Sequence, residues 1–135
     1  MNTIQVLFDI IYPLECWFNP VWEKIPGGLY GVYIFFEIDE ESKNCRALYV
    51  GHSNRMRRRI KEHLKGWSEL YDIMDYTNVE HIYLGIKLGA MKRVEEEYIQ
   101  MLNPVYNIMH KDRWAGTRAF RALTRFTGEE PPGWI

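Results

Sequence analysis

Residues 30–51 read YGVYIFFEIDEESKNCRALYVG, and this stretch decides the fold. Between residues 30 and 38, the even-numbered positions are all aliphatic or aromatic, whereas the odd-numbered positions include a glycine and a glutamate. This alternation predicts a strand of which one face is more apolar than the other. The acidic and polar segment 39–44 predicts a hairpin loop, and residues 46–51 resume the strand pattern. The sequence therefore predicts two strands that pair as a hairpin.

Each of these strands carries one tyrosine on its less aliphatic face. Tyr33 lies opposite the aliphatic row of the first strand, and Tyr49 lies opposite Leu48 and Val50 in the second. If the strands pair with their aliphatic rows on one side, the two tyrosines share the other side of the sheet.

A basic helix is predicted to follow the second strand, with Ser53 as its N-cap. At about 100° per residue, its apolar stripe consists of Met56, Ile60, Leu64 and Trp67. His63 falls inside this stripe and Arg59 on its shoulder, whereas Arg58 projects to the opposite, solvated side. Because Arg59 and His63 are four residues apart, they lie on one helix face. Polar aromatic residues and cations gathered in this way suggest a site that holds a phosphate and cuts beside it.

A third strand over residues 79–88 and a second helix over residues 90–102 complete the regular pattern, and a proline closes the helix. Glu95 lies within the apolar arc of this helix, whereas Glu96 and Glu97 point away from it. A carboxylate on a core-facing arc is costly unless it is paired, hydrogen-bonded or bound to a metal. Two interpretations of Glu95 stay open: a metal ligand, and a buried carboxylate paired with an arginine.

The segments outside this pattern give weaker signals. The apolar segment 4–14 is interrupted by Asp9 and Pro13 and is too short to span a bilayer, so we expect a helix or strand that packs on the core. No basic leader precedes it. Residues 67–78 predict an irregular connection, and residues 115–126 predict a helix.

The bulk composition is that of one globular domain. The chain has 135 residues, 47% of them hydrophobic, so it can bury a core without a disulfide or a metal. Cys16 and Cys45 lack metal-ligand spacing, and we expect reduced thiols in a cytoplasmic protein. The net charge of −1 hides two basic clusters, residues 55–65 and 111–125. Local basic clusters matter more than net charge for phosphate contact, although both could equally be solvated faces.

Five elements of the chain occur in a fixed order. The first three are Gly31-Val32-Tyr33, Tyr49-Val50-Gly51 and the helical segment from Arg59 to His63. The other two are the helical segment from Glu95 to Ile99 and the tetrapeptide Pro104-Val105-Tyr106-Asn107. In this order and at this spacing they resemble the GIY-YIG nuclease family.

This resemblance covers residues 31–107 and implies an α+β fold, with a small three-stranded antiparallel sheet flanked by helices. It divides the chain into an N-terminal extension that packs on the core (1–29), a nuclease core (30–107) and a basic, aromatic C-terminal extension (108–135). We expect the three parts to form a single globular domain. The hairpin loop 39–44 is a little longer than is usual in the family, which affects substrate contacts and leaves each motif residue in place.

The function that the resemblance implies is a metal-dependent endonuclease acting on duplex or branched DNA. The implied catalytic residues are Tyr33, Tyr49, Arg59, His63, Glu95 and Asn107. Glu95 would bind one Mg²⁺ or Mn²⁺ ion, and Arg59 would neutralise charge in the transition state. Either tyrosine would be the general base once nearby cations lower the pKa of its phenol. His63 would relay the proton, and Asn107 would orient substrate or a neighbouring group.

Contacts with the DNA backbone are predicted for five further cations: Arg55, Arg57, Lys61, Arg118 and Arg121. Such contacts position a nucleic acid without reading its sequence. The remaining histidines (His52, His81 and His110) have no metal-ligand spacing, and we interpret them as structural or surface residues. We expect no membrane partner.

Two other functions stay open from the sequence. A nucleic-acid-binding module that does not cleave would explain the basic clusters and the small size of the chain. A protein-interaction domain would explain the tryptophan-rich flanks, which could equally cover the sheet or form the face of a homodimer.

Overall fold

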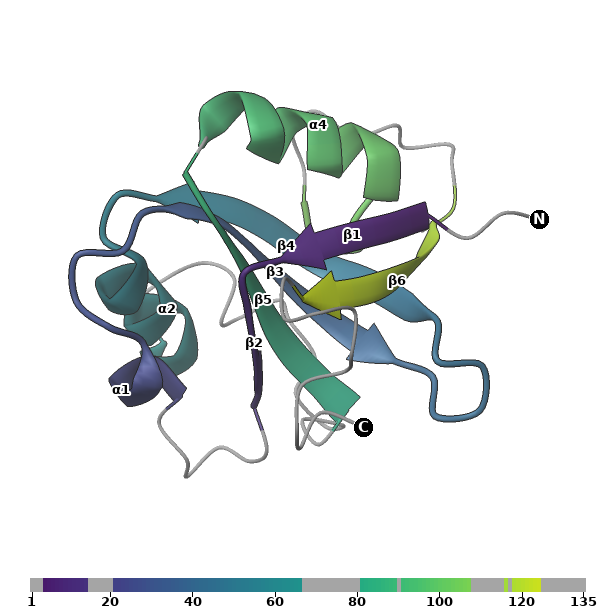
Figure 1. Ribbon diagram of the computed structural model, residues 1–135, viewed down its shortest axis with the longest axis horizontal. Coiled ribbons are helices and arrows are strands. Elements are labelled where there is room, and N and C mark those ends of the chain that lie inside the picture. Colours follow the sequence, from purple (N-terminus) through teal and green to yellow (C-terminus); the bar gives the residue numbers. More distant parts are fainter. Residues whose placement is uncertain are drawn as a thin grey trace.

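The computed structural model describes residues 4–14, 21–66, 81–89, 91–107, 116 and 118–124. These residues form an α+β fold around one curled six-stranded sheet (Figure 1). Across the sheet the strands are β1 (Ile4–Phe8), β6 (Ala119–Thr124), β4 (Cys45–Ser53), β3 (Gly31–Ile38), β5 (Ile82–Leu88) and β2 (Ile10–Pro13). The α+β class is confirmed. The expected three-stranded sheet is wrong, because strands from both flanks extend the antiparallel centre of β4, β3 and β5.

The predicted hairpin forms the centre of the sheet. β3 pairs antiparallel with β4 on one side and with β5 on the other. The loop between β3 and β4 is closed by hydrogen bonds from the amide of Asp39 to the carbonyl of Asn44 (2.9 Å) and from the amide of Lys43 to the carbonyl of Asp39 (2.8 Å). The predicted strands and the loop 39–44 are therefore confirmed. The described part of the third strand begins at Ile82, and residues 79–80 lie outside the described residues.

The register of β3 against β4 shifts at a bulge between Phe35 and Phe36, where Leu48 is the extra residue of β4. As a result Leu48 packs in one core layer and Val50 in the other, so the expectation that they share a face is wrong. The two tyrosines nevertheless share one side of the sheet, as predicted, with their ring centroids 6.3 Å apart.

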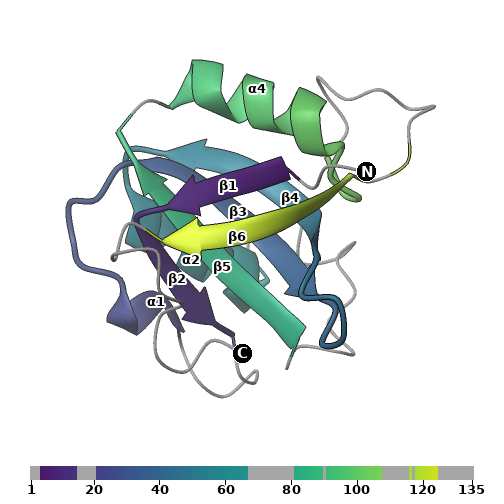
Figure 2. The same cartoon turned by 45° about the vertical axis from the view of Figure 1, so that its right-hand side comes forward.

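The N-terminal segment turns a corner at Asp9 and joins both edges of the sheet (Figures 1 and 2). β1 pairs parallel with β6, and β2 pairs antiparallel with β5. The Asp9 amide donates to the carbonyl of Ile86 (2.8 Å), and the Asp9 carboxylate accepts from the amide of Leu88 (2.7 Å). This curl buries Phe8 against Gly85, where a Cβ atom would lie 2.4 Å from the Phe8 ring. The segment expected to be a core-packing helix or strand is thus a pair of strands.

The helix predicted over residues 115–126 is wrong, because the described part of this segment contains strand β6. Phe120, Ala122 and Thr124 are buried, while Ala119 and Arg121 are exposed, which is the two-residue period of a strand. β1 supplies a parallel pairing partner for β6 from Phe120 to Thr124. Long-range pairing therefore overrides the local helical preference of this segment.

The helices cover the two faces of the sheet separately (Figure 1). α4 (Lys92–Leu102) packs Ile99 and Leu102 against one face. α1 (Val21–Lys24) and α2 (Met56–Lys65) pack against the opposite face, α2 through Met56 and Ile60. The tyrosine side of the hairpin therefore faces α2.

The starts of the two longer helices differ slightly from their predicted positions. α2 begins at Met56, and Ser53 is the last residue of β4 instead of the N-cap. The Ser53 hydroxyl accepts a hydrogen bond from the amide of Arg55 (2.9 Å), so it stabilises the turn that leads into the helix. α4 begins at Lys92 and ends at Leu102; its C-cap, Asn103, has a left-handed conformation (φ 47°) and precedes the proline that was predicted to close the helix.

Cys45 is a buried free thiol, and burial raises its pKa to about 11. The connection 67–78 and Cys16 lie outside the described residues. Among the helices that the structure describes, none has the length and apolar character needed to cross a membrane.

Candidate active site

Tyr33 and His63 form a buried pair at the centre of the site. The Tyr33 hydroxyl lies 2.6 Å from Nε2 of His63, and each residue is 1% exposed. Strand alternation turns Tyr33 toward α2, and helix periodicity turns His63 toward the sheet. Burial, followed by the nearby Arg59 guanidinium, lowers the pKa of His63 to about 3. The imidazole is therefore neutral at pH 7, and the hydrogen bond joins two uncharged groups.

Two motif glycines allow backbones and rings to approach closely at this site. Gly51 lies directly opposite Tyr33, and a Cβ atom there would lie 2.4 Å from the Tyr33 hydroxyl oxygen and from its Cζ. A Cβ atom at Gly31 would lie 2.1 Å from the backbone oxygen of Lys87 on β5. Glycine at these positions lets the phenol cross β4 to reach His63 and lets β3 approach β5.

Tyr49 completes a cluster of three rings. Its centroid lies 5.5 Å from that of His63 in an edge-on arrangement. Tyr49 is half-buried, whereas Tyr33 is fully enclosed. The Tyr49 ring is therefore the more accessible of the two phenols.

Arg59 lies one helical turn before His63 and is half-buried. Its Nη1 donates to Oε2 of Glu62 (2.8 Å), and its guanidinium also interacts with the Tyr33 hydroxyl. Burial is the largest influence on Tyr33 and raises its pKa, the Tyr49 phenol adds to this effect, and Arg59 opposes it. Arg59 thus lowers the pKa of the Tyr33 phenol, as expected of a nearby cation, but burial outweighs this effect.

Glu95 lies on α4 and contacts Nδ1 of His52, the β4 residue that follows the second tripeptide. The expectation of an arginine partner is wrong, because His52 shares the face of β4 that is turned toward α4. Sequence reasoning missed this histidine, although its position two residues after Val50 on an alternating strand was a usable signal. The Glu95 side chain is 17% exposed, and its charge raises the pKa of Tyr33, after the larger effects of burial and Tyr49. The carboxylate is thus electrostatically linked to the ring cluster.

The donor set around Glu95 fits a hard cation that keeps much of its own water. Within the described residues, no group of three histidine, cysteine, aspartate or glutamate side chains could enclose a metal ion. A single partly exposed carboxylate is a usual protein contribution to a Mg²⁺ site, because Mg²⁺ dehydrates reluctantly and retains several waters.

Asn107 fixes the chain that follows α4 to the edge of β4 beyond its short pairing with β6. Its side-chain oxygen accepts from the amide of Val50 (2.8 Å), and its side-chain nitrogen donates to the carbonyl of Val50 (2.9 Å). The amides of Val105 and Tyr106 donate to the carbonyls of Ala47 and Leu48 in the same way (3.2 and 2.8 Å). Asn107 therefore positions the strand segment that carries Tyr49.

The basic residues separate into two locations. Arg55 and Arg57 are exposed, and Lys61 is half-buried, at or along α2. Arg118 and Arg121 are exposed at β6, and Arg121 donates to the carbonyl of Ser42 in the hairpin loop (3.0 Å). That loop is at the opposite end of the hairpin from the glycine ends of the two motifs, so Arg121 does not join the ring cluster. DNA contacts by all five cations stay predictions.

Comparison with known protein families identifies the central part of the chain. A family model described as the GIY-YIG catalytic domain matches residues 29–107. No curated protein and no solved structure matches the chain significantly. The matched segment contains every residue of the ring cluster together with Arg59, Glu95 and Asn107.

Proposed function

The chain belongs to the GIY-YIG catalytic-domain family, and we propose that it is a metal-dependent endonuclease that hydrolyses DNA phosphodiester bonds with one divalent cation. Family membership by itself suggests a nuclease and therefore a nucleic-acid substrate. The observation that carries the finer proposal is the buried pair of Tyr33 and His63 at 2.6 Å, with Arg59 beside it. A partly exposed carboxylate, Glu95, lies on α4 at the other face of the sheet.

Phosphodiester hydrolysis needs an activated water, neutralisation of the growing phosphate charge and help for the leaving oxygen. Glu95 would hold a divalent cation, which when bound supplies charge neutralisation and Lewis-acid assistance. Arg59 would neutralise further charge on the transferred phosphate by charge-assisted hydrogen bonds. To do so, it would exchange its contact with Glu62 for the phosphate oxygens.

Tyr49 is the better candidate for the group that takes the proton from water. Tyr33 is enclosed, its pKa is raised mainly by burial, and its hydroxyl is held by His63. Tyr49 is half-buried, so water and substrate would reach its side chain more easily than that of Tyr33. In this assignment Tyr33 and His63 hold the Tyr49 ring in place, and Asn107 fixes the strand beneath it.

Cleavage of supercoiled plasmid and of a panel of duplex, single-stranded and branched DNA tests the proposal. We expect nicked or linear products with Mg²⁺ or Mn²⁺ and none with a chelator. If the protein binds these DNAs with a steep salt dependence but leaves them intact with either metal, it is the non-cleaving binding module and the proposal fails.

A further inference from the structure

A hollow lies beside α2, and no residue of the ring cluster lines it. It has a volume of about 450 Å³ and is lined by α1, by Gly28 before β3, by the turn between β4 and α2, and by the first half of α2. Such a volume is within the range of roughly 300–1,000 Å³ that is usual for ligand pockets. Its lining includes the following aromatic and charged side chains: Trp22, Glu23, Arg55, Arg57, Arg58 and Lys61. We call it the α1–α2 pocket.

The lining of the α1–α2 pocket is strongly cationic. Four basic side chains face one acid, Glu23. Arg58 also contacts Glu62 at 3.4 Å, and the remaining lining still carries an excess of positive charge. The first turn of α2 contains no acidic residue, and no side chain caps its N-terminus at Arg55. Helix N-termini attract anions, so the backbone and the side chains favour the same ligand charge.

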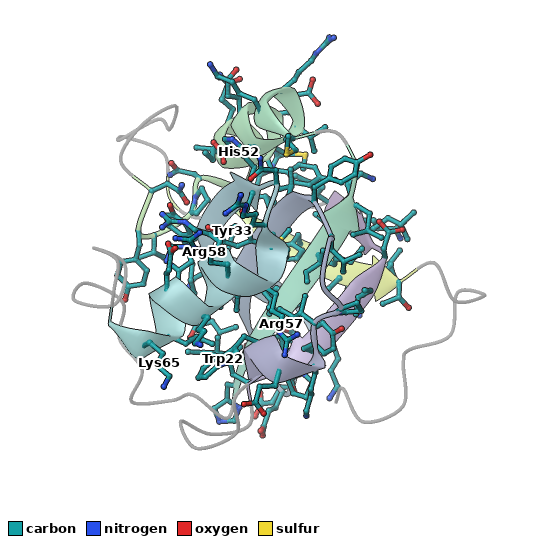
Figure 3. The ribbon with its side chains drawn as sticks, turned by 90° about the vertical axis from the view of Figure 1, so that its left-hand side faces the viewer. Trp22, Tyr33, His52, Arg57, Arg58 and Lys65 are labelled. Carbon is teal, nitrogen blue, oxygen red and sulfur yellow. The ribbon has the colours of Figure 1, made fainter. Side chains whose placement is uncertain are left out.

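Trp22 adds an aromatic surface to this cationic lining. It is half-buried, and Nζ of Lys65 lies 5.7 Å from the centre of its ring. Figure 3 shows Trp22 between Lys65 and Arg57, with Arg58 and Tyr33 on the same side of the molecule. Aromatic rings set among cations are the features that bind unpaired nucleotides, because the ring stacks on a base while the cations hold the backbone.

The α1–α2 pocket and the candidate active site share one helix. α2 presents Arg59 and His63 to the ring cluster, whereas Arg57, Arg58 and Lys61 line the pocket. A DNA strand with a phosphate at Arg59 could therefore extend along α2 toward Trp22.

We propose that the α1–α2 pocket binds an unpaired nucleotide of the DNA substrate, with the base on Trp22 and the backbone phosphate held by the pocket's arginines. The inference rests on the proposed nuclease function and extends it to the kind of substrate. A base within a duplex is stacked on its neighbours and is not free to occupy the pocket. The protein therefore prefers duplexes that carry a single-stranded end or flap.

Fluorescence anisotropy in the presence of a chelator tests this preference without cleavage. Two ligands are compared: a blunt duplex, and the same duplex with a short single-stranded extension. We expect the extension to improve affinity at least about 5-fold, the lower end of the effect of stacking one base on an aromatic ring. Trp22→Leu should remove this gain, and the double variant Arg57→Ala/Lys61→Ala should reduce it.

Arg46→Ala is the matched control. Arg46 is a half-exposed arginine paired with Glu37 at the far end of β4, and its loss should leave the gain from the extension unchanged. The double variant changes residues outside the apolar core, so it tests the pocket even if Trp22→Leu does not fold. Equal affinity of the wild type for both ligands would overturn the inference, as would a full gain retained in the folded variants.

The two proposals fail in different ways. If the protein cleaves blunt duplex with Mg²⁺ but the extension does not improve affinity, the proposed role of the α1–α2 pocket is wrong and the nuclease assignment stands. If the extension improves affinity through Trp22 but no DNA is cleaved, nucleotide binding by the pocket is supported and the nuclease assignment is wrong.

Discussion

Gly51 controls how the Tyr33 ring fits against β4. A methyl group at this position would lie 2.4 Å from the Tyr33 hydroxyl oxygen, closer than any van der Waals contact allows. We expect Gly51→Ala to lower the free energy of unfolding by about 1–3 kcal/mol, as is typical of overpacking, and to lower nuclease activity because the Tyr33–His63 contact is displaced. Urea denaturation and DNA cleavage measure the two effects.

Gly27→Ala is the control for this substitution. Gly27 is exposed, and a Cβ atom there would meet nothing within 4 Å. Gly27→Ala should change the free energy of unfolding by no more than about 0.5 kcal/mol. If both alanine variants change the free energy of unfolding equally, close packing against Tyr33 does not explain why residue 51 is a glycine.

His63 gives the folded protein a defined dependence on pH. Its pKa is lowered to about 3, mainly by burial and further by Arg59, whereas an unfolded histidine titrates near about 6.5. Below about pH 6.5 the unfolded chain binds the extra proton and the folded chain does not, so stability falls as pH falls toward 3. The contribution of His63 to this slope is at most about 1.4 kcal/mol per pH unit.

Urea denaturation between about pH 7 and pH 5 isolates this contribution when the wild type is compared with His63→Gln. As the pH falls, the free energy of unfolding should decrease more in the wild type than in the variant. Above about pH 7 the two proteins should show the same dependence of stability on pH. Parallel curves for the two proteins would show that His63 titrates normally in the folded state.

We propose that His52 is a positioning residue for the Glu95 carboxylate, which it contacts. Partners of this kind orient a metal ligand, and their loss typically weakens metal binding about 10–100-fold. We expect His52→Ala to weaken Mn²⁺ binding in this range, measured by calorimetry with the full chain and no DNA. His81→Ala removes a histidine that contacts Glu40 at 3.3 Å, and it should leave Mn²⁺ affinity unchanged. Unchanged affinity in His52→Ala would exclude this role.

At the scale of secondary-structure elements, the chain after α4 behaves as a short extra edge to β4. Asn107 makes two hydrogen bonds to the backbone of Val50, the neighbour of Tyr49. Asn107→Ala would leave that donor and acceptor without their partner, which typically costs about 1–3 kcal/mol. Chemical denaturation should show this loss, and cleavage should weaken because β4 is less fixed at Tyr49.

Asn54→Ala serves as the comparison, because Asn54 is exposed at the turn before α2. It should alter the free energy of unfolding by less than about 0.5 kcal/mol. A loss as small in Asn107→Ala would mean that water replaces the side chain at the β4 edge without cost.

The central elements could be predicted from sequence because their signals are local. Alternation located β3, β4 and β5, and helical projection selected His63 and Glu95 from their charged neighbours. The bulge at Leu48 could not be predicted, since one extra residue in a strand leaves no mark on its composition. β6 was mistaken for a helix because its pairing partner, β1, lies more than a hundred residues earlier in the chain. The partner of Glu95 was missed for a related reason: His52 reaches it only when β4 and α4 are packed together.

At the scale of the whole molecule, both flanks contribute to the same sheet as the matched family segment. β1 and β2 pair with β6 and β5, and Phe8 and Phe120 are buried in the core layer beneath α4. Phe8 stacks on Phe36 of the central strand with their ring centroids 5.5 Å apart. We therefore propose that segments 1–29 and 108–135 complete one domain with the nuclease core 30–107.

The candidate catalytic residues lie on two sides of this sheet. The ring cluster lies between the sheet and α2, whereas Glu95 and His52 meet at the other face, beneath α4. In the register of the hairpin, His52 pairs with Val32 and Gly51 with Tyr33, next to the end where Gly31 pairs with Ser53. We propose that a phosphate bound near this end contacts both Arg59 and a cation held by Glu95.

The rate of DNA cleavage by wild type, Glu95→Gln and Glu97→Gln in Mg²⁺ tests the central claim most directly. Glu97 lies two residues away on the same helix, is exposed and contacts only the exposed Arg93 among the ion pairs of the described residues. We expect cleavage by the wild type, a rate at least about 100-fold lower in Glu95→Gln, and a rate within about 2-fold of wild type in Glu97→Gln. Equal rates in wild type and Glu95→Gln, or no cleavage by the wild type, would contradict the account.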